Sequence, residues 1–121
     1  MIAIGNTNGK GRGVFAKKHF NTGEVIEQAP VIIIQHEQWS LIERTALYNY
    51  CYDWGDDTAF ALGYGSLYNH SYHPNAIYVK KYEDASVEFV ALRNIEPDEE
   101  ITINYNSRPD DFSPLWFDIL P

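Results

Sequence analysis

The sequence predicts one domain of mostly β structure, built from short strands and a single short helix. Short runs rich in Val, Ile, Phe and Tyr alternate with turn residues, whereas only one stretch carries helical spacing. The 121 residues suffice to bury roughly two thirds of the unfolded surface, so we expect residues 1–121 to form one domain.

The first strands are expected at residues 13–18, "GVFAKK", and 24–35, "EVIEQAPVIIIQ". The turn signal "NTG" lies between them, which predicts a hairpin or meander. The helix is expected at 40–50, "SLIERTALYNY", because Ser40 and Glu43 have the spacing of a capping box. Four residues then follow at helical spacing: Ala46, Leu47, Tyr50 and Cys51.

The second half of the chain predicts three more strands. Residues 76–82, "AIYVKKY", and 86–93, "SVEFVALR", flank the short polar segment "EDA" and predict a second hairpin. Residues 101–105, "ITINY", follow the turn signal "EPDE". A polar and aromatic tail, residues 106–121, ends the chain.

Charge and composition narrow the function. The 17 acidic and 9 basic residues give a formal charge of -8, which repels nucleic-acid backbones and favours a cationic partner such as a lysine-rich peptide, although acidity can also serve solubility alone. The single cysteine, Cys51, excludes an internal disulfide and a cysteine-based zinc site. No apolar run approaches the roughly 20 residues of a membrane span, and the N-terminal residues lack a secretory signal, so we expect an intracellular protein.

The segment "YNHSYHPNA" at 68–76 concentrates polar side chains that suit a metal site, a turn or a ligand. His70 and His73 provide only two imidazoles, and His19 and His36 lie in unrelated segments, so no metal site is predicted. Pro74 and its neighbours have the chemistry of a turn. These residues alone leave a turn and a ligand contact equally open.

Three blocks change that balance: "GKGRGVFAKKHFNTGEVIE" (9–27), "LGYGSLYNHSYHPNAIY" (62–78) and "IEPDEEITINY" (95–105). In this order and spacing they resemble the motifs of the SET domain, the protein-lysine methyltransferase family. The likeness is to its compact, free-standing members, such as small viral SET proteins. It implies a β-clip fold of small twisted sheets, with the second and third blocks crossing in a C-terminal pseudoknot.

The resemblance also implies S-adenosylmethionine as the methyl donor and a lysine side chain entering a narrow channel from the opposite face. Two groups of residues match the positions that hold the donor: Lys10, Gly11, Arg12 and Gly13 on the GxG motif, and Asn69 and His70 on the NH pair. Glycine suits the first motif because a backbone without Cβ can approach a ligand closely. A hairpin turn would explain the same glycines, and His70 could equally be a core histidine.

Three of the nine tyrosines match positions that line the lysine channel of the family: Tyr50, Tyr78 and Tyr105. Tyr105 also matches the tyrosine at the site of methyl transfer, next to the donor, and Gly65 a position whose carbonyl faces the channel. Tyrosine at position 78 implies a channel that stops at one or two methyl groups. Four other tyrosines are expected to be ordinary core residues: Tyr48, Tyr52, Tyr68 and Tyr82.

Two features depart from the family pattern. Asp98 stands where a glycine often precedes the last motif, and aspartate tolerates a left-handed turn position. The tail also lacks a cysteine-rich module to close the channel. Trp116 and Phe117 are the candidates to cover the donor, the channel or a dimer contact.

The predicted activity is methyl transfer from S-adenosylmethionine to a lysine of a basic protein or peptide, histone-like or otherwise, in the cytoplasm or nucleus. The lysine must be neutral to attack, and burial beside a sulfonium lowers its pKa, so no carboxylate base is needed. The alternatives are a SET module that binds donor or peptide without turnover, and a small acidic interaction domain. A homodimer would be one way to complete the substrate groove.

Overall fold

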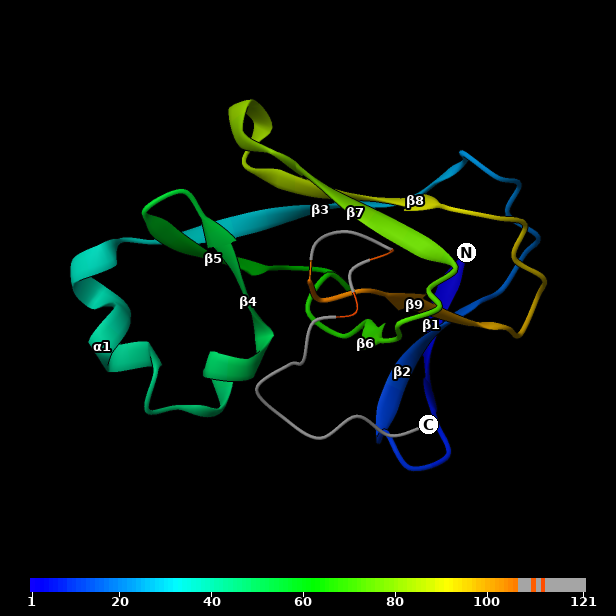
Figure 1. Ribbon diagram of the computed structural model, residues 1–121, viewed down its shortest axis with the longest axis horizontal. Coiled ribbons are helices and arrows are strands. Elements are labelled where there is room, and N and C mark those ends of the chain that lie inside the picture. The colour runs from blue at the N-terminus through cyan, green and yellow to red at the C-terminus, as the bar shows by residue number, and fades with distance from the viewer. Residues whose placement is uncertain (107–109, 111, 113–121) are drawn as a thin grey trace.

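The computed structural model describes residues 1–106, 110 and 112, and it contains two curled sheets (Figure 1). The smaller sheet has the order β1-β2-β9-β6 and the larger the order β4-β5-β3-β8-β7, which confirms the mostly β prediction. None of the helices in the described ranges is long and apolar enough to cross a bilayer. The strand bounds are β1 Ile2–Asn6, β2 Arg12–Ala16, β3 Val25–Ile34, β4 Cys51–Trp54, β5 Asp57–Ala61, β6 Asn69–His70, β7 Ala76–Lys81, β8 Ser86–Ala91 and β9 Glu100–Ile103.

The predicted pairing of the first two strands is wrong. β2 pairs with β1 and β9 in the smaller sheet, while β3 pairs with β5 and β8 in the larger one. The "NTG" turn does form, with the Glu24 amide donating to the Asn21 carbonyl at 2.9 Å. It carries the chain from one sheet to the other, because β1, which we did not predict, takes the partner position beside β2.

The larger sheet contains the second predicted hairpin. β7 and β8 pair antiparallel from Ala76↔Ala91 to Lys81↔Ser86, which confirms it. The connecting 3₁₀ helix η3, Tyr82–Asp84, ends at Ala85, whose φ of 49° is left-handed. β4 and β5 were not predicted, and β5 pairs with β4 and with the second half of β3. The first half of β3 pairs with β8 and contains a bulge between Val25 and Glu27.

The predicted helix at 40–50 is wrong in length and in its cap. The segment forms η1 (His36–Gln38), a four-residue α1 (Trp39–Ile42) and η2 (Ala46–Tyr50), and none of the three buries a residue. A continuous helix needs an apolar face packed on a core, which this segment lacks. Ser40 lies inside α1 instead of capping it, and Thr45 caps η2 by accepting from the Leu47 amide.

The second and third sequence blocks pair directly, as expected. β6 lies parallel to β9, with Asn69 opposite Thr102 and His70 opposite Ile103. Asn75 ties the following turn to β9: its Nδ2 donates to the Glu100 carbonyl at 2.8 Å, and its Oδ1 accepts from the Thr102 amide at 2.8 Å. Asn75 of the "HPN" turn thus adds two hydrogen bonds beside β6, a strand whose own pairing with β9 involves only two residues.

The turn before β9 confirms the expectation for Asp98, whose φ is 70°. Its amide donates to the Ala16 carbonyl at 2.7 Å, and its carboxylate pairs with Lys17 at 3.0 Å. The core lies where the sheets pack together. Its largest fully buried side chains are Tyr68, Phe89, Ile95, Ile101, Ile103, Val14, Val87 and Asn75.

Candidate active site

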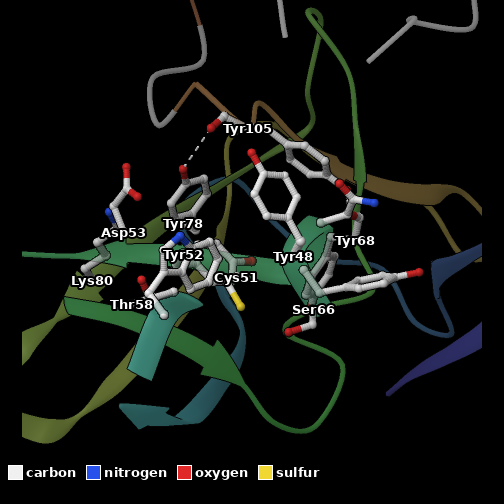
Figure 2. Close-up of a pocket in the computed structure, with 13 residues that line it drawn as sticks. Tyr48, Cys51, Tyr52, Asp53, Thr58, Ser66, Tyr68, Tyr78, Lys80 and Tyr105 are labelled. Atoms are coloured by element: carbon white, nitrogen blue, oxygen red, sulfur yellow. Dashed lines mark hydrogen bonds between the residues drawn. The ribbon is translucent and has the colours of Figure 1, made fainter. Parts of the chain in front are cut away.

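A pocket of about 310 Å³ opens where the two edge strands of the larger sheet approach each other (Figure 2). Tyr52 of β4 and Tyr78 of β7 are in contact, with ring centroids 5.1 Å apart, and Trp54 of β4 contacts Tyr82 of η3, with centroids 4.7 Å apart. The lining side chains come from six parts of the chain: Trp39, Tyr48, Asn49, Tyr50, Cys51, Tyr52, Asp53, Thr58, Ser66, Tyr68, Tyr78, Lys80 and Tyr105.

Tyr105 is held at both ends. Its hydroxyl donates to the Tyr68 carbonyl at 2.5 Å, and its backbone amide donates to Nδ1 of His70 at 3.0 Å. Burial, with the nearby Tyr50 next in importance, raises the pKa of the Tyr105 hydroxyl above its ordinary value. The hydroxyl therefore stays protonated at neutral pH and orients groups as a donor and acceptor instead of acting as a base.

Tyr78 and Tyr52 complete the polar wall. The Tyr78 hydroxyl donates to the Tyr105 carbonyl at 3.3 Å, drawn as a dashed line in Figure 2. The Tyr52 hydroxyl donates to the Gly65 carbonyl at 2.6 Å. Gly65 admits no side chain, since a Cβ would lie 2.6 Å from the Cβ of Ala61. Gly65 itself does not line the pocket, and its carbonyl bonds to Tyr52, which does.

The residues expected to hold the donor also come together. Nζ of Lys10 donates to the His70 carbonyl at 3.3 Å, and Nδ2 of Asn69 donates to the Arg12 carbonyl at 2.9 Å. His70 joins this cluster to the pocket, because its ring accepts the Tyr105 amide. Hydrogen bonds therefore link the GxG block, the NH pair and Tyr105, and of these residues Tyr105 also lines the pocket.

The two glycines of the GxG motif, Gly11 and Gly13, differ in their surroundings. Gly11 has a left-handed φ of 73°, and a Cβ there would meet nothing within 4 Å, so its surroundings leave room for a ligand. A Cβ on Gly13 would instead come within 2.5 Å of Oε2 of Glu100 and 2.9 Å of Nδ2 of Asn69. Gly13 is therefore required by the packing of this chain's own side chains.

His70 is buried, and only one of its two ring nitrogens is bonded. Nδ1 accepts from Tyr105, whereas the buried Nε2 has no hydrogen-bond partner among the described residues. Burial, assisted by the charge of Lys10, lowers the pKa of His70 to about 4. The ring is neutral at pH 7, with its proton on Nε2, and this unpartnered polar group is of a kind that bound ligands often satisfy.

The depressed His70 pKa predicts acid sensitivity. Below its ordinary value of 6.5 the unfolded chain binds a proton that the folded chain refuses, so stability falls as the pH falls from 6.5 towards 4. The expected loss is of the order of 2 to 3 kcal/mol, measurable as urea unfolding free energy at pH 7, 6, 5 and 4.5. We expect His70→Gln to abolish most of this slope.

His19 provides the control, because a hydrogen bond to Glu96 raises its pKa and gives it the opposite slope. His19→Gln should keep the loss of stability below pH 6.5. If stability does not change between pH 6 and 4.5 in the His19→Gln protein, His70 does not titrate as described.

Lys80 reports on the electrostatics of the pocket that it lines. Burial lowers its pKa below the ordinary value, although the charge of Asp53 opposes the shift. An ammonium group is therefore penalised in this environment, and an amine brought into the pocket meets the same desolvation.

The structure corrects the division of the tyrosines. The three predicted for the channel, Tyr50, Tyr78 and Tyr105, all line the pocket, but so do Tyr48, Tyr52 and Tyr68. Of the tyrosines expected in the core, Tyr68 is a core residue as predicted, with 1% of its surface exposed, and Tyr52 packs against the core, whereas Tyr48 is 43% exposed. Tyr82 is not a core residue either, because it is 55% exposed. Alternating tyrosines at 48, 50 and 52 were the signal available in the sequence. Trp116 and Phe117 lie outside the described residues.

Comparisons with known proteins agree with this geometry. Residues 11–106 match the SET domain. The chain is 34% identical over 119 residues to a Schizosaccharomyces pombe protein described as a histone-lysine N-methyltransferase specific for lysine 37 of H3, covering 97% of this chain and 77% of the relative. It superposes on the crystal structure of a candidate histone methyltransferase of Plasmodium falciparum with a TM-score of 0.71, at 37% identity, over 87% of this chain and 96% of that one.

A subunit of the Chaetomium thermophilum Polycomb Repressive Complex 2 shares the fold, with a TM-score of 0.74 at 18% identity over 87% of this chain and 15% of that one. The chain belongs to the SET-domain family and is a protein-lysine methyltransferase.

Proposed function

We propose that this protein transfers a methyl group from S-adenosylmethionine to a lysine side chain of a basic protein, with a histone tail as the first candidate. The cluster formed by Lys10, Gly11, Asn69 and His70 would hold the donor, which supplies an electrophilic methyl group. The tyrosine pocket would receive the lysine. The S. pombe relative, described as acting on histone H3, and the formal charge of -8 support a basic substrate.

The observation that carries the proposal is the bond between the Tyr105 amide and His70. This bond joins the proposed donor-binding residues to the tyrosine pocket. The hydroxyl of Tyr105 would then lie between the methyl donor and the substrate lysine. Holding two reactants in line supplies several kcal/mol of the barrier, roughly 7 or more in the best cases.

The amine must lose its proton before it attacks, and the pocket favours this step. Burial already lowers the pKa of Lys80 within the same cavity, and a donor sulfonium would add a positive charge nearby. No residue is then needed as a dedicated base. The neutral hydroxyls of Tyr105 and Tyr78 would orient the amine by accepting its hydrogen bonds.

The test is transfer of radiolabelled methyl groups from S-adenosylmethionine to core histones and a lysine-rich peptide library, with donor binding followed by calorimetry. Label on a histone or a basic peptide supports the proposal. Donor binding without transfer to any member of the panel would favour a module that binds without turnover. Absence of donor binding would contradict the assigned donor site.

The extent of methylation provides a second prediction. The Tyr78 hydroxyl fills space beside Tyr105, and its removal would make room for a larger methylated amine. We expect Tyr78→Phe to shift the product towards higher methylation, measured by mass spectrometry of the peptide, with little loss of total transfer. An unchanged product distribution would show that Tyr78 does not limit the number of methyl groups.

A further inference from the structure

Glu27 does not line the pocket, but its carboxylate bonds to Tyr68, which does, and to the neighbouring Tyr64. Glu27 sits at the bulge of β3, where the strand changes register. Oε1 accepts from the Tyr68 hydroxyl at 2.8 Å, and Oε2 accepts from the Tyr64 amide at 3.0 Å. Among the described residues it forms no salt bridge. Both recorded hydrogen bonds of its carboxylate go to one segment, residues 62–68.

That segment supplies the two carbonyl groups that hold the pocket tyrosines. The Gly65 carbonyl accepts from Tyr52 and the Tyr68 carbonyl accepts from Tyr105. The segment also lies directly on the carboxylate, because a Cβ on Gly63, whose φ is 60°, would fall within van der Waals overlap of Oε2 of Glu27. The Glu27 side chain therefore holds the 62–68 backbone, whose carbonyls orient the hydroxyls of Tyr52 and Tyr105.

We propose that Glu27 is a positioning residue for methyl transfer, acting through Tyr68 and the 62–68 segment on the hydroxyl of Tyr105. Hydrogen bonds to a carboxylate are shorter and roughly twice as strong as those between neutral groups, so this anchor is stiffer than an amide would be. Stiffness matters because a misplacement of about 1 Å can reduce a rate roughly 100-fold. This inference rests on the role proposed above for Tyr105.

Glu27→Gln tests the anchor, because the amide has nearly the same shape but offers one acceptor in place of two. We expect kcat to fall about tenfold, while the dissociation constant of S-adenosylmethionine and the KM of the peptide stay within about twofold. The control is Glu83→Gln on the exposed helix η3, which makes the same chemical change and should leave all three constants unchanged.

A spectroscopic measurement separates positioning from the catalytic proposal itself. With ¹³C at the tyrosine Cζ atoms, the Tyr105 signal reports its bond to the Tyr68 carbonyl whether or not the chain methylates the panel. We expect this signal to shift in Glu27→Gln and, to a smaller extent, in Tyr68→Phe, and to stay in place in Glu83→Gln. Tyr68→Phe keeps the Tyr64 contact and serves if Glu27→Gln does not fold.

The double variant completes the test. If Glu27 acts through Tyr68, the losses of kcat in Glu27→Gln and Tyr68→Phe should be less than additive when combined. An unmoved Tyr105 signal in Glu27→Gln, or in Tyr68→Phe where only that protein folds, would overturn the proposal. So would a loss that appears only in the KM or only in donor affinity. The two proposals can also fail separately. If the parent chain transfers no methyl group but the Tyr105 signal still shifts in Glu27→Gln, Glu27 does position Tyr105 and the proposed function is refuted.

Discussion

Tyr105→Phe is expected to reduce methyl transfer at least 100-fold while leaving the fold intact. The hydroxyl is fixed at 2.5 Å from the Tyr68 carbonyl, and the backbone of the same residue is fixed by His70, so its position at the pocket is over-determined. Losing it removes the group that would orient the amine, at a cost of about 2.7 kcal/mol or more in the transition state. The measurement is kcat on a labelled peptide, with donor affinity by calorimetry.

Tyr82→Phe provides the matched control, because Tyr82 is exposed and contacts Trp54 outside the pocket lining. We expect full activity from it. If Tyr105→Phe keeps more than a tenth of the parent kcat on the same peptide, Tyr105 does not have the role that its position indicates. A parallel fall in thermal stability would point to a structural defect, since one buried hydroxyl contributes only about 1 kcal/mol.

The largest loss of stability is expected from Asn75→Ala. Asn75 is 1% exposed, and its amide group bonds to the Glu99 carboxylate, the Glu100 carbonyl and the Thr102 amide. Alanine leaves backbone groups of β9 without partners, so we expect a loss of about 3 kcal/mol or more in the urea unfolding free energy. β6 contributes only two residues to its parallel pairing, so little else compensates.

Asn94→Ala is the control for this change. The Asn94 side chain also accepts two hydrogen bonds, from the amide and hydroxyl of Thr22, but at an exposed site where water replaces it. We expect a loss of about 1 kcal/mol or less. Equal losses for the two variants would mean that the Asn75 bonds do not hold the β6–β9 junction.

The class of fold and the three blocks that match the SET family could be predicted from the sequence alone. Local signals were sufficient where the structure is local: the β7–β8 hairpin follows its alternating apolar residues, and Asp98 adopts the left-handed φ that a turn before β9 requires. The motif residues Asn69, His70 and Tyr105 lie close together in the fold, as the resemblance to the SET domain implied.

The division of the strands between two sheets and the set of tyrosines that line the pocket could not be predicted from the sequence. The "NTG" turn predicts a reversal of the chain. The actual partners of β2 lie elsewhere: Ala16 pairs with Ile2, 14 residues away, and Val14 pairs with Ile101, 87 residues away. Tyr52 and Tyr82 have the same composition signal, yet one donates to the Gly65 carbonyl and the other faces solvent. Long-range contacts of this kind leave no periodicity in the chain, because the partner lies in another segment. The hydrogen bonds from Tyr64 and Tyr68 to Glu27 are likewise contacts between distant segments of the chain.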